Sequence, residues 1–227
     1  MRSRRDPAAA REALITILRH AYSGERAAAL AYRGHWRSLP DGPDRRRIRE
    51  IEEDEWRHRE CVGGMLAGLG ERPSLWRDAR AAIVGSVLGV LCHVAGRLAP
   101  MYGAGRLERT NIREYETAAL LAVETGRDAW IESFLEMAEV EWEHERYFRS
   151  RVGGHPWARW IPVWTAPAPK WEIRRSFRHR ASGIRGPSSS DPIEASRGRG
   201  PSSVDPAKAL MIRAIRRAVA RHRARVS

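Results

Sequence analysis

The chain has 227 residues, which is enough for one sizeable domain with appendages or for two small domains. Its formal net charge of +13 lies in residues 151–227, where 17 Lys and Arg outnumber 4 Asp and Glu, because residues 1–150 carry 24 basic and 24 acidic residues. A basic excess favours a nucleic acid or an anionic membrane as partner, but here it does so for the tail alone. The two cysteines are too few for a disulfide framework and lack CxxC spacing.

The first predicted elements form a helical hairpin. Apolar residues recur about every 3.6 residues across 7–38, and the helix breakers in 39–43 end that stretch. A second helix is expected to begin near Asp44, which we interpret as its N-cap, and to stop at 68–73. The short connection predicts that the two helices run antiparallel.

A second hairpin follows an apolar segment. Residues 81–96 are almost wholly apolar, and sixteen residues fall short of the ~20 that a membrane-spanning helix needs. The Pro and Gly residues of 100–105 predict a kink or break before a third core helix over 106–124, and the fourth covers about 128–151. No stretch of residues 1–150 alternates with period two for long enough to form a strand, so an all-α bundle over 7–154 is predicted.

The second helix of each hairpin carries a Glu-x-x-His motif. A carboxylate and an imidazole three residues apart leave the same face of a helix, which is the spacing of metal ligands. One such motif is common in a charged helical protein, but here each is preceded by a helix with a further Glu at a similar place. Four carboxylates and two imidazoles in a bundle core suit two divalent ions, either iron or manganese. The six predicted ligands are Glu25, Glu55, His58, Glu108, Glu141 and His144.

These residues resemble the demethoxyubiquinone hydroxylases of the ferritin-like superfamily. The resemblance covers residues 10–155 and rests on Gly24-Glu25, both Glu-x-x-His motifs, Leu107-Glu108 with Tyr115, and the apolar stretch 81–96, where that family has its membrane-facing helices. It implies a ferritin-like antiparallel four-helix bundle with an extra apolar helical segment before the third core helix. It also implies two iron ions, with Glu55 and Glu141 as the bridging carboxylates and manganese as the alternative metal.

The resemblance implies an oxygen-dependent di-iron monooxygenase that hydroxylates a quinone-like or apolar aromatic substrate in ubiquinone biosynthesis. The chain has no GxGxxG fingerprint of a flavin or nicotinamide site, so an external electron donor is expected as partner beside dioxygen and the substrate. Two alternatives stay open. One is a rubrerythrin-like peroxidase or a ferroxidase, and the other is a non-enzymatic adaptor that binds a membrane or a nucleic acid through its basic tail. A nucleic acid is the less favoured partner, and a homo-oligomer is a further candidate assembly.

Two tyrosines stand seven residues after the lone glutamates and are the predicted catalytic residues. Tyr32 and Tyr115 would hydrogen-bond to the ligands or relay protons and electrons, and the alternative is that both simply pack in the core. Asn111, one turn after Glu108, is a candidate hydrogen-bonding amide. The other histidines of the bundle are expected to be structural or exposed, namely His20, His35 and His93.

The basic tail is expected to be flexible and divides into three parts. Residues 155–181 form an extension rich in Trp, Pro and Arg, which either lies at a membrane interface or packs over the apolar helix. A disordered linker is expected over 182–206 and a short basic amphipathic helix over 207–225. Because no signal-peptide run follows residues 1–10, we expect a cytoplasmic protein, or one held peripherally on the cytoplasmic face of a membrane.

Overall fold

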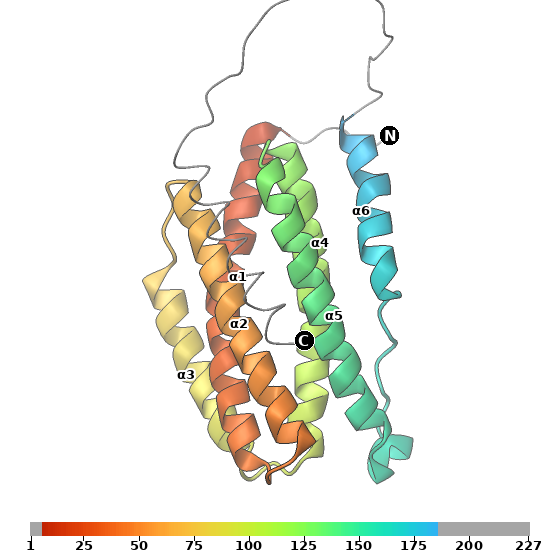
Figure 1. Ribbon diagram of the computed structural model, residues 1–227. Coiled ribbons are helices and arrows are strands. Elements are labelled where there is room, and N and C mark those ends of the chain that lie inside the picture. The colour runs from red at the N-terminus through yellow and green to blue at the C-terminus, as the bar shows by residue number, and fades with distance from the viewer. Residues whose placement is uncertain (1–5, 186–227) are drawn as a thin grey trace, which may run out of the picture. The chain divides into compact units, whose positions relative to one another are not determined.

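A computed structural model describes residues 6–185, which form helices and connecting loops with no strand among them (Figure 1). This confirms the all-α prediction. Residues 186–206 of the expected linker and the expected helix over 207–225 lie outside the described part of the chain.

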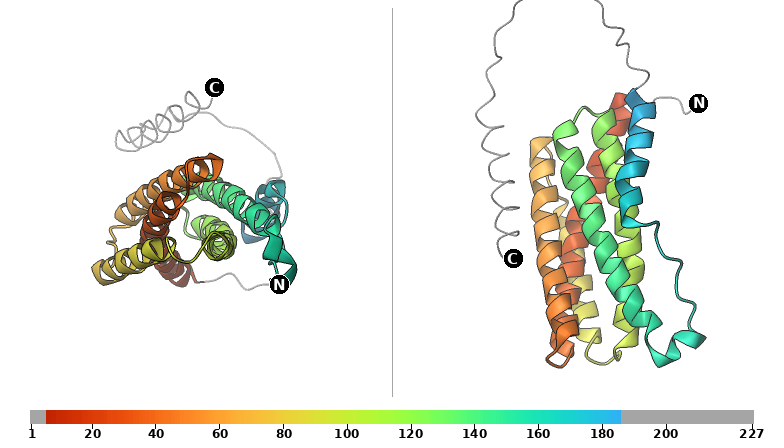
Figure 2. Two further views of the ribbon diagram at one scale, coloured as in Figure 1. Left: turned by 90° about the horizontal axis from the view of Figure 1, so that it is seen from below. Right: turned by 45° about the vertical axis from the view of Figure 1, so that its right-hand side comes forward.

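Four long helices form an antiparallel bundle, which Figure 2 shows from one end. They are α1 (Pro7–Ser38), α2 (Pro43–Gly68), α4 (Leu98–Glu124) and α5 (Ile131–Gly153). α1 pairs with α2, and α4 pairs with α5, so the two hairpins predicted from the sequence are present. The ferritin-like four-helix bundle expected from the resemblance is therefore the fold of this domain.

Proline placement explains where α1 begins and ends. The Asp6 carboxylate accepts a hydrogen bond from the backbone N–H of Ala8 at 3.2 Å, and Pro7 occupies the first position, where its missing N–H costs nothing. Leu39 is extended, as the residue before a proline tends to be, and the helix stops there.

The start of α2 differs from the prediction. α2 begins at Pro43, preceded by Gly42, so Asp44 lies inside the helix and does not cap it. The Asp44 carboxylate instead pairs with Arg97 at 2.9 Å and with Arg151 at 2.8 Å. Asp44 thus ties the start of α2 to the start of α4 and the end of α5.

The sequence allowed a kink or a break at 100–105, and the break is not present. α4 begins at Leu98 and continues through Gly103 and Gly105 to Glu124. Pro100 is tolerated because it lies in the first turn, where backbone N–H groups have no partner within the helix.

The extra apolar helix α3 (Leu75–Leu91) packs lengthwise on α1, on the far side of the bundle from α6 (Figure 1). Their backbones approach so closely that only glycine fits at the crossing. A Cβ on Gly85 would lie 2.3 Å from the carbonyl oxygen of Ala27, and a Cβ on Gly34 would lie 2.3 Å from the Cα of Gly89. The glycines of the apolar stretch therefore join α3 to the bundle through backbone contact.

The outer face of α3 leaves large apolar side chains exposed, with Val90 as much as 70% exposed. Among the described helices, none is both long and apolar enough to cross a membrane. The exposed apolar residues of this helix include Leu75, Trp76, Ile83, Val87 and Val90.

The extension after the bundle folds onto α4 and α5. A short 3-10 turn, Pro156–Trp160, leads to an extended stretch and then to α6 (Lys170–Arg185). The indole Nε1 of Trp164 donates to Glu145 at 2.7 Å, and the guanidinium of Arg174 contacts Glu139 and Glu132. The extension thus packs on the bundle, but on the side away from α3, and the sequence-based expectation that it covers the apolar helix is wrong.

Helix α6 was not expected from the sequence. The helix includes the basic run of the extension. The last four residues of the helix, 182–185, were predicted to belong to the disordered linker. Three indoles of the extension remain outward, and these exposed side chains belong to Trp157, Trp160 and Trp171.

Candidate metal centre

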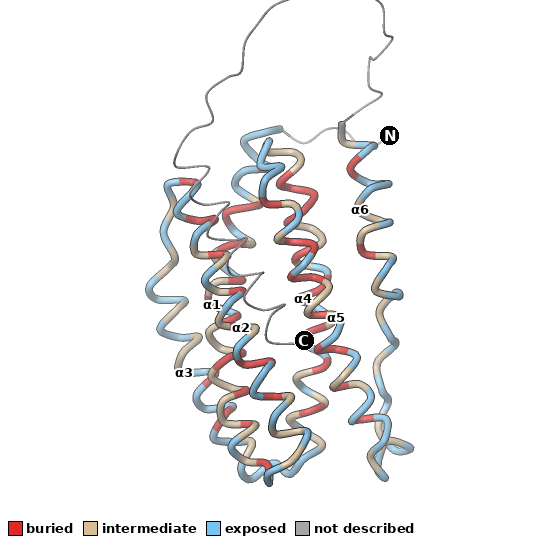
Figure 3. Tube along the Cα trace, in the orientation of Figure 1, coloured by how far each residue is buried: buried red, intermediate tan, exposed pale blue. Residues whose placement is uncertain are grey.

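The six predicted ligands lie in the middle of the bundle, between two apolar clusters. One cluster, around Leu18, Leu66 and Phe134, fills one end of the bundle, and the other, around Ile51 and Phe148, fills the opposite end. Every candidate ligand is between 0 and 6% exposed. Figure 3 shows how buried positions recur along the helices of the bundle. The apolar ends therefore enclose a polar centre that water reaches poorly.

The ligand atoms form two overlapping groups of four. Within each group, one nitrogen or oxygen atom from every residue lies within 4.8 Å of the others. Glu55 and Glu141 belong to both groups, as expected of carboxylates that bridge two metal ions. The groups are Glu25, Glu55, His58 and Glu141, and Glu55, Glu108, Glu141 and His144.

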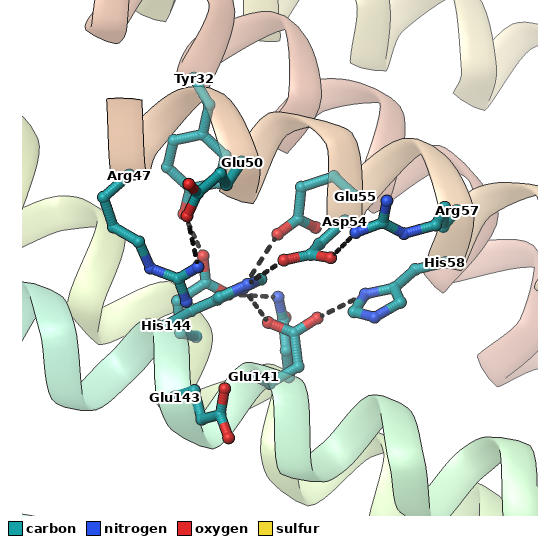
Figure 4. Close-up of polar contacts among 12 residues, drawn as sticks. Tyr32, Arg47, Glu50, Asp54, Glu55, Arg57, His58, Glu141, Glu143 and His144 are labelled. Carbon is teal, nitrogen blue, oxygen red and sulfur yellow. Dashed lines mark hydrogen bonds and ion pairs between the residues drawn. The ribbon is translucent and has the colours of Figure 1, made fainter. Parts of the chain in front are cut away.

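Several of these atoms have no hydrogen-bond partner, which tests whether the residues fit a metal pair. Both carboxylate oxygens of Glu55 and of Glu141 are buried and unsatisfied, and so is Nδ1 of His58 and of His144. His58 Nδ1 lies 3.0 Å from Glu141 Oε1, and His144 Nδ1 lies 3.3 Å from Glu55 Oε1 (Figure 4). None of these four atoms has a hydrogen-bond partner. Buried polar atoms are rarely left unpaired, because each costs free energy. Lone pairs that converge in this way fit two divalent cations.

The pKa shifts of the buried glutamates also fit a site for two cations. Burial, together with repulsion by Glu141, raises the pKa of Glu55 to about 8. Burial raises the pKa of Glu25 and of Glu108 well above the ordinary value, and a neighbouring carboxylate adds to the effect in each case. Burial also disfavours ionised Glu141, but its contacts with His144 and His58 outweigh this and lower its pKa. Without metal the centre must hold protons, which divalent ions would displace.

The two predicted catalytic tyrosines reach across the bundle. The hydroxyl of Tyr32 on α1 donates to Glu108 on α4, and the hydroxyl of Tyr115 on α4 donates to Glu25 on α1. Burial, followed by the nearby carboxylates, raises the pKa of both tyrosines well above the ordinary value, so both are neutral donors. Asn111 Nδ2 donates to the second oxygen of Glu108 at 3.0 Å.

Asp54 is part of the centre, although sequence reasoning missed it. Its Oδ2 lies 3.0 Å from Nε2 of His144, and its Oδ1 pairs with Arg57 (Figure 4). A proton on Nε2 shared with Asp54 leaves the Nδ1 lone pair of His144 free to face Glu55 and Glu141. Hydrogen bonding to His144 lowers the pKa of Asp54 against the opposing effect of burial. Spacing in α2 gave no signal of this contact, because the partner is on α5.

Two further buried polar residues, His35 and Glu145, lie outside the centre. His35 stacks on Phe148, and burial lowers its pKa to about 4, so the ring is neutral and structural. Glu145 is fully buried next to His144, but it accepts hydrogen bonds from Arg149 at 3.0 Å and from Trp164. Neither belongs to the two converging groups.

Comparison with known families agrees with this geometry. Residues 12–146, more than half of the chain, match the family model described as Ubiquinone biosynthesis protein COQ7. No curated protein and no solved structure gives a significant match. The matched range contains all six candidate ligands, both tyrosines and Asp54. The chain therefore belongs to the COQ7 family of ubiquinone biosynthesis proteins, the di-iron demethoxyubiquinone hydroxylases, and is an enzyme of that type.

Proposed function

We propose that the chain holds two iron ions among its six buried ligands and hydroxylates the ring of a quinone-like substrate. The observation that carries the proposal is the pair of overlapping four-residue groups that share Glu55 and Glu141. Four carboxylates offset the charge of two divalent ions, so the loaded centre is close to neutral and tolerates burial. The family match supports iron as the metal and ubiquinone biosynthesis as the pathway.

The reaction requires dioxygen and an external electron donor. One oxygen atom enters a ring C–H bond, while the other leaves as water with two protons and two electrons from the donor. When bound, the two ferrous ions supply the electrons that reduce dioxygen, and the donor restores them. The described helices enclose the centre, which keeps bulk water away from the reacting oxygen.

In this proposal the chain's own residues orient the ligands and hold protons. Asp54 fixes the ring of His144, and Asn111 holds one oxygen of Glu108. Tyr32 and Tyr115 are positioned to supply a proton to a glutamate ligand, because each already donates a hydrogen bond to one. Each tyrosine bonds a glutamate on the other of the two helices, α1 and α4, so the pair of contacts also joins these helices across the centre.

The exposed apolar face of α3 supports a further part of the proposal, a peripheral position on a membrane surface. An apolar quinone-like substrate resides in the membrane, so attachment there would shorten its path to the enzyme. The outward indoles of the extension favour an interface of the same kind.

Metal content and product analysis test the proposal together. We expect the purified protein to carry about two irons per chain. With a quinol-type substrate and a reductant, it should consume dioxygen and release a hydroxylated product, detected by mass spectrometry with labelled dioxygen. A protein that binds ferrous iron but turns over only hydrogen peroxide would favour the peroxidase alternative. A protein that binds no iron after anaerobic reconstitution would contradict every metal-dependent function.

Replacing Tyr32 or Tyr115 by phenylalanine should reduce turnover without loss of the bound metal. For Tyr32→Phe and Tyr115→Phe we expect kcat to fall by about 100-fold, the lower range for loss of a positioned proton donor, with iron content unchanged. The matched control is Tyr147→Phe, because Tyr147 donates to Asp44 at 2.9 Å, away from the ligands. Wild-type turnover in both variants would assign the tyrosines to packing alone.

A further inference from the structure

A small pocket opens between α1 and α4 and reaches one of the candidate ligands. His20 and Glu114 stand at its mouth, where their side chains are 70% and 19% exposed and His20 Nδ1 lies 3.2 Å from Glu114 Oε1. Glu25 and Tyr115 lie at its inner end and are both buried. The pocket therefore leads from solvent to the carboxylate that α1 contributes to the centre.

The carboxylate at the inner end of the pocket has one oxygen without a hydrogen-bond partner. Tyr115 donates to Oε1 of Glu25, but Oε2 is buried and has no partner. Glu25 both lines the pocket and belongs to the first group of converging ligands, so a cation that reaches its carboxylate from outside is at the edge of the centre. The side chains at the mouth, one imidazole and one carboxylate, are of the same chemical types as the ligands of the centre.

The size of the pocket limits what can pass. Its volume is about 50 Å³, against roughly 300–1,000 Å³ for pockets that hold drug-sized ligands. A quinone ring with substituents does not fit, whereas a metal ion with one or two waters does. At Gly24, on the pocket wall, a Cβ would meet no heavy atom within 4 Å. Gly24 thus leaves the passage open where another residue would narrow it.

We propose that this pocket is the entrance through which divalent metal ions reach the centre, with His20 and Glu114 as transient ligands at its mouth. The inference rests on the proposed metal-binding function and adds a path to it. An ion held at the mouth would exchange waters for the imidazole and the carboxylate, then pass Gly24 to Oε2 of Glu25. A carboxylate at the mouth also raises the local concentration of cations and so the rate of association.

The first test closes the passage while leaving every ligand in place. Metal-free Gly24→Leu protein would be mixed anaerobically with Co²⁺, whose visible absorption reports occupation of the centre, and the same protein would be loaded with Fe²⁺ for metal analysis. We expect uptake to slow by about tenfold or more, because entry must then wait for local opening of the helices. The final content should remain about two ions per chain, and removal of the metal by a chelator should slow in parallel.

The matched control is Gly103→Leu. Gly103 also lies on a bundle helix with no heavy atom within 4 Å of an added Cβ, but it does not line the pocket. This variant should load at the wild-type rate. Equal rates for Gly24→Leu and wild type would overturn the proposed entrance, as would a Gly24→Leu protein with reduced final content, since the pocket would then belong to the structure of the centre.

A second pair of variants tests the mouth. Glu114→Gln should slow uptake by about tenfold, the lower end of the gain that electrostatic focusing provides. Glu116→Gln, on the same helix but away from the pocket, should not change it. An unchanged rate for Glu114→Gln contradicts the role of the mouth. Absence of metal from the wild-type protein at equilibrium would instead contradict the proposed function itself, so the two failures are distinguishable.

Discussion

Glu141→Ala is expected to lower the iron content from about two ions per chain to nearly none. Glu141 belongs to both four-residue groups, so its removal takes an oxygen ligand from each metal position at once. It also leaves the nearby imidazoles of His58 and His144 without the carboxylate that they contact at 3.0 and 3.4 Å. His144→Ala should have a similar effect through the loss of a nitrogen ligand. Metal analysis of protein reconstituted anaerobically with ferrous iron measures both.

The control for this prediction lies on the same helix. Glu143 is two residues from Glu141 but points outward, where it pairs with Lys170, so Glu143→Gln should retain both ions (Figure 4). Far-UV circular dichroism of each variant would show whether the bundle is still folded, and Glu141→Gln repeats the test with a side chain of the same size. A folded Glu141→Ala protein with two irons would contradict the assignment of the centre.

Asp54→Asn is expected to weaken metal binding by about 10- to 100-fold, the range seen when the partner of a metal-bound histidine is lost. Asp54 holds the ring of His144 through the 3.0 Å contact to Nε2, and an amide can donate to that nitrogen and so favour the wrong tautomer. Nδ1 would then carry the proton and could not bind metal. Competition with a chelator of known affinity measures the change.

Glu53→Gln is the matched control, because Glu53 is the neighbouring acidic residue and lies on the exposed face, 3.7 Å from Arg49. Its metal affinity should equal that of the wild type. A loss of metal affinity as large in Glu53→Gln as in Asp54→Asn would contradict the role given to the contact with His144.

The paired arrangement of the centre follows from the repeated hairpin. Each hairpin contributes one glutamate from its first helix and a Glu-x-x-His pair from its second helix. The crossed tyrosine contacts extend this symmetry, because each first helix also hydrogen-bonds the glutamate of the other. His144 has a carboxylate partner in Asp54, the residue before Glu55, whereas the residue before Glu141 is Val140, whose side chain cannot accept a hydrogen bond. The two proposed metal positions are therefore alike in their candidate ligands and unlike in their surroundings.

The sequence by itself determined the fold class, the helical hairpins and the six candidate ligands. These features are local or periodic: apolar spacing places the core faces, and a three-residue step sets a carboxylate and an imidazole on the same face of one helix. The family resemblance rested on the same residues, and the match over residues 12–146 confirms it. Proline and glycine positions were a weaker guide to where helices end, since Pro100 lies in the first turn of α4 and does not break it.

Only the tertiary structure decided which residues meet across helices. The contact between Asp54 and His144 joins residues 90 positions apart, and so does the one between Tyr115 and Glu25. The sequence left open whether the basic extension lies at a membrane interface or packs on the bundle, because the acidic partners of Arg174, Glu132 and Glu139, lie on α5. Spacing along one helix gives the face of a side chain, but its partner depends on how the helices are packed and rotated against one another. The candidate ligands could therefore be named from the sequence, whereas the residues that contact them and the pocket beside Glu25 became visible only in the folded chain.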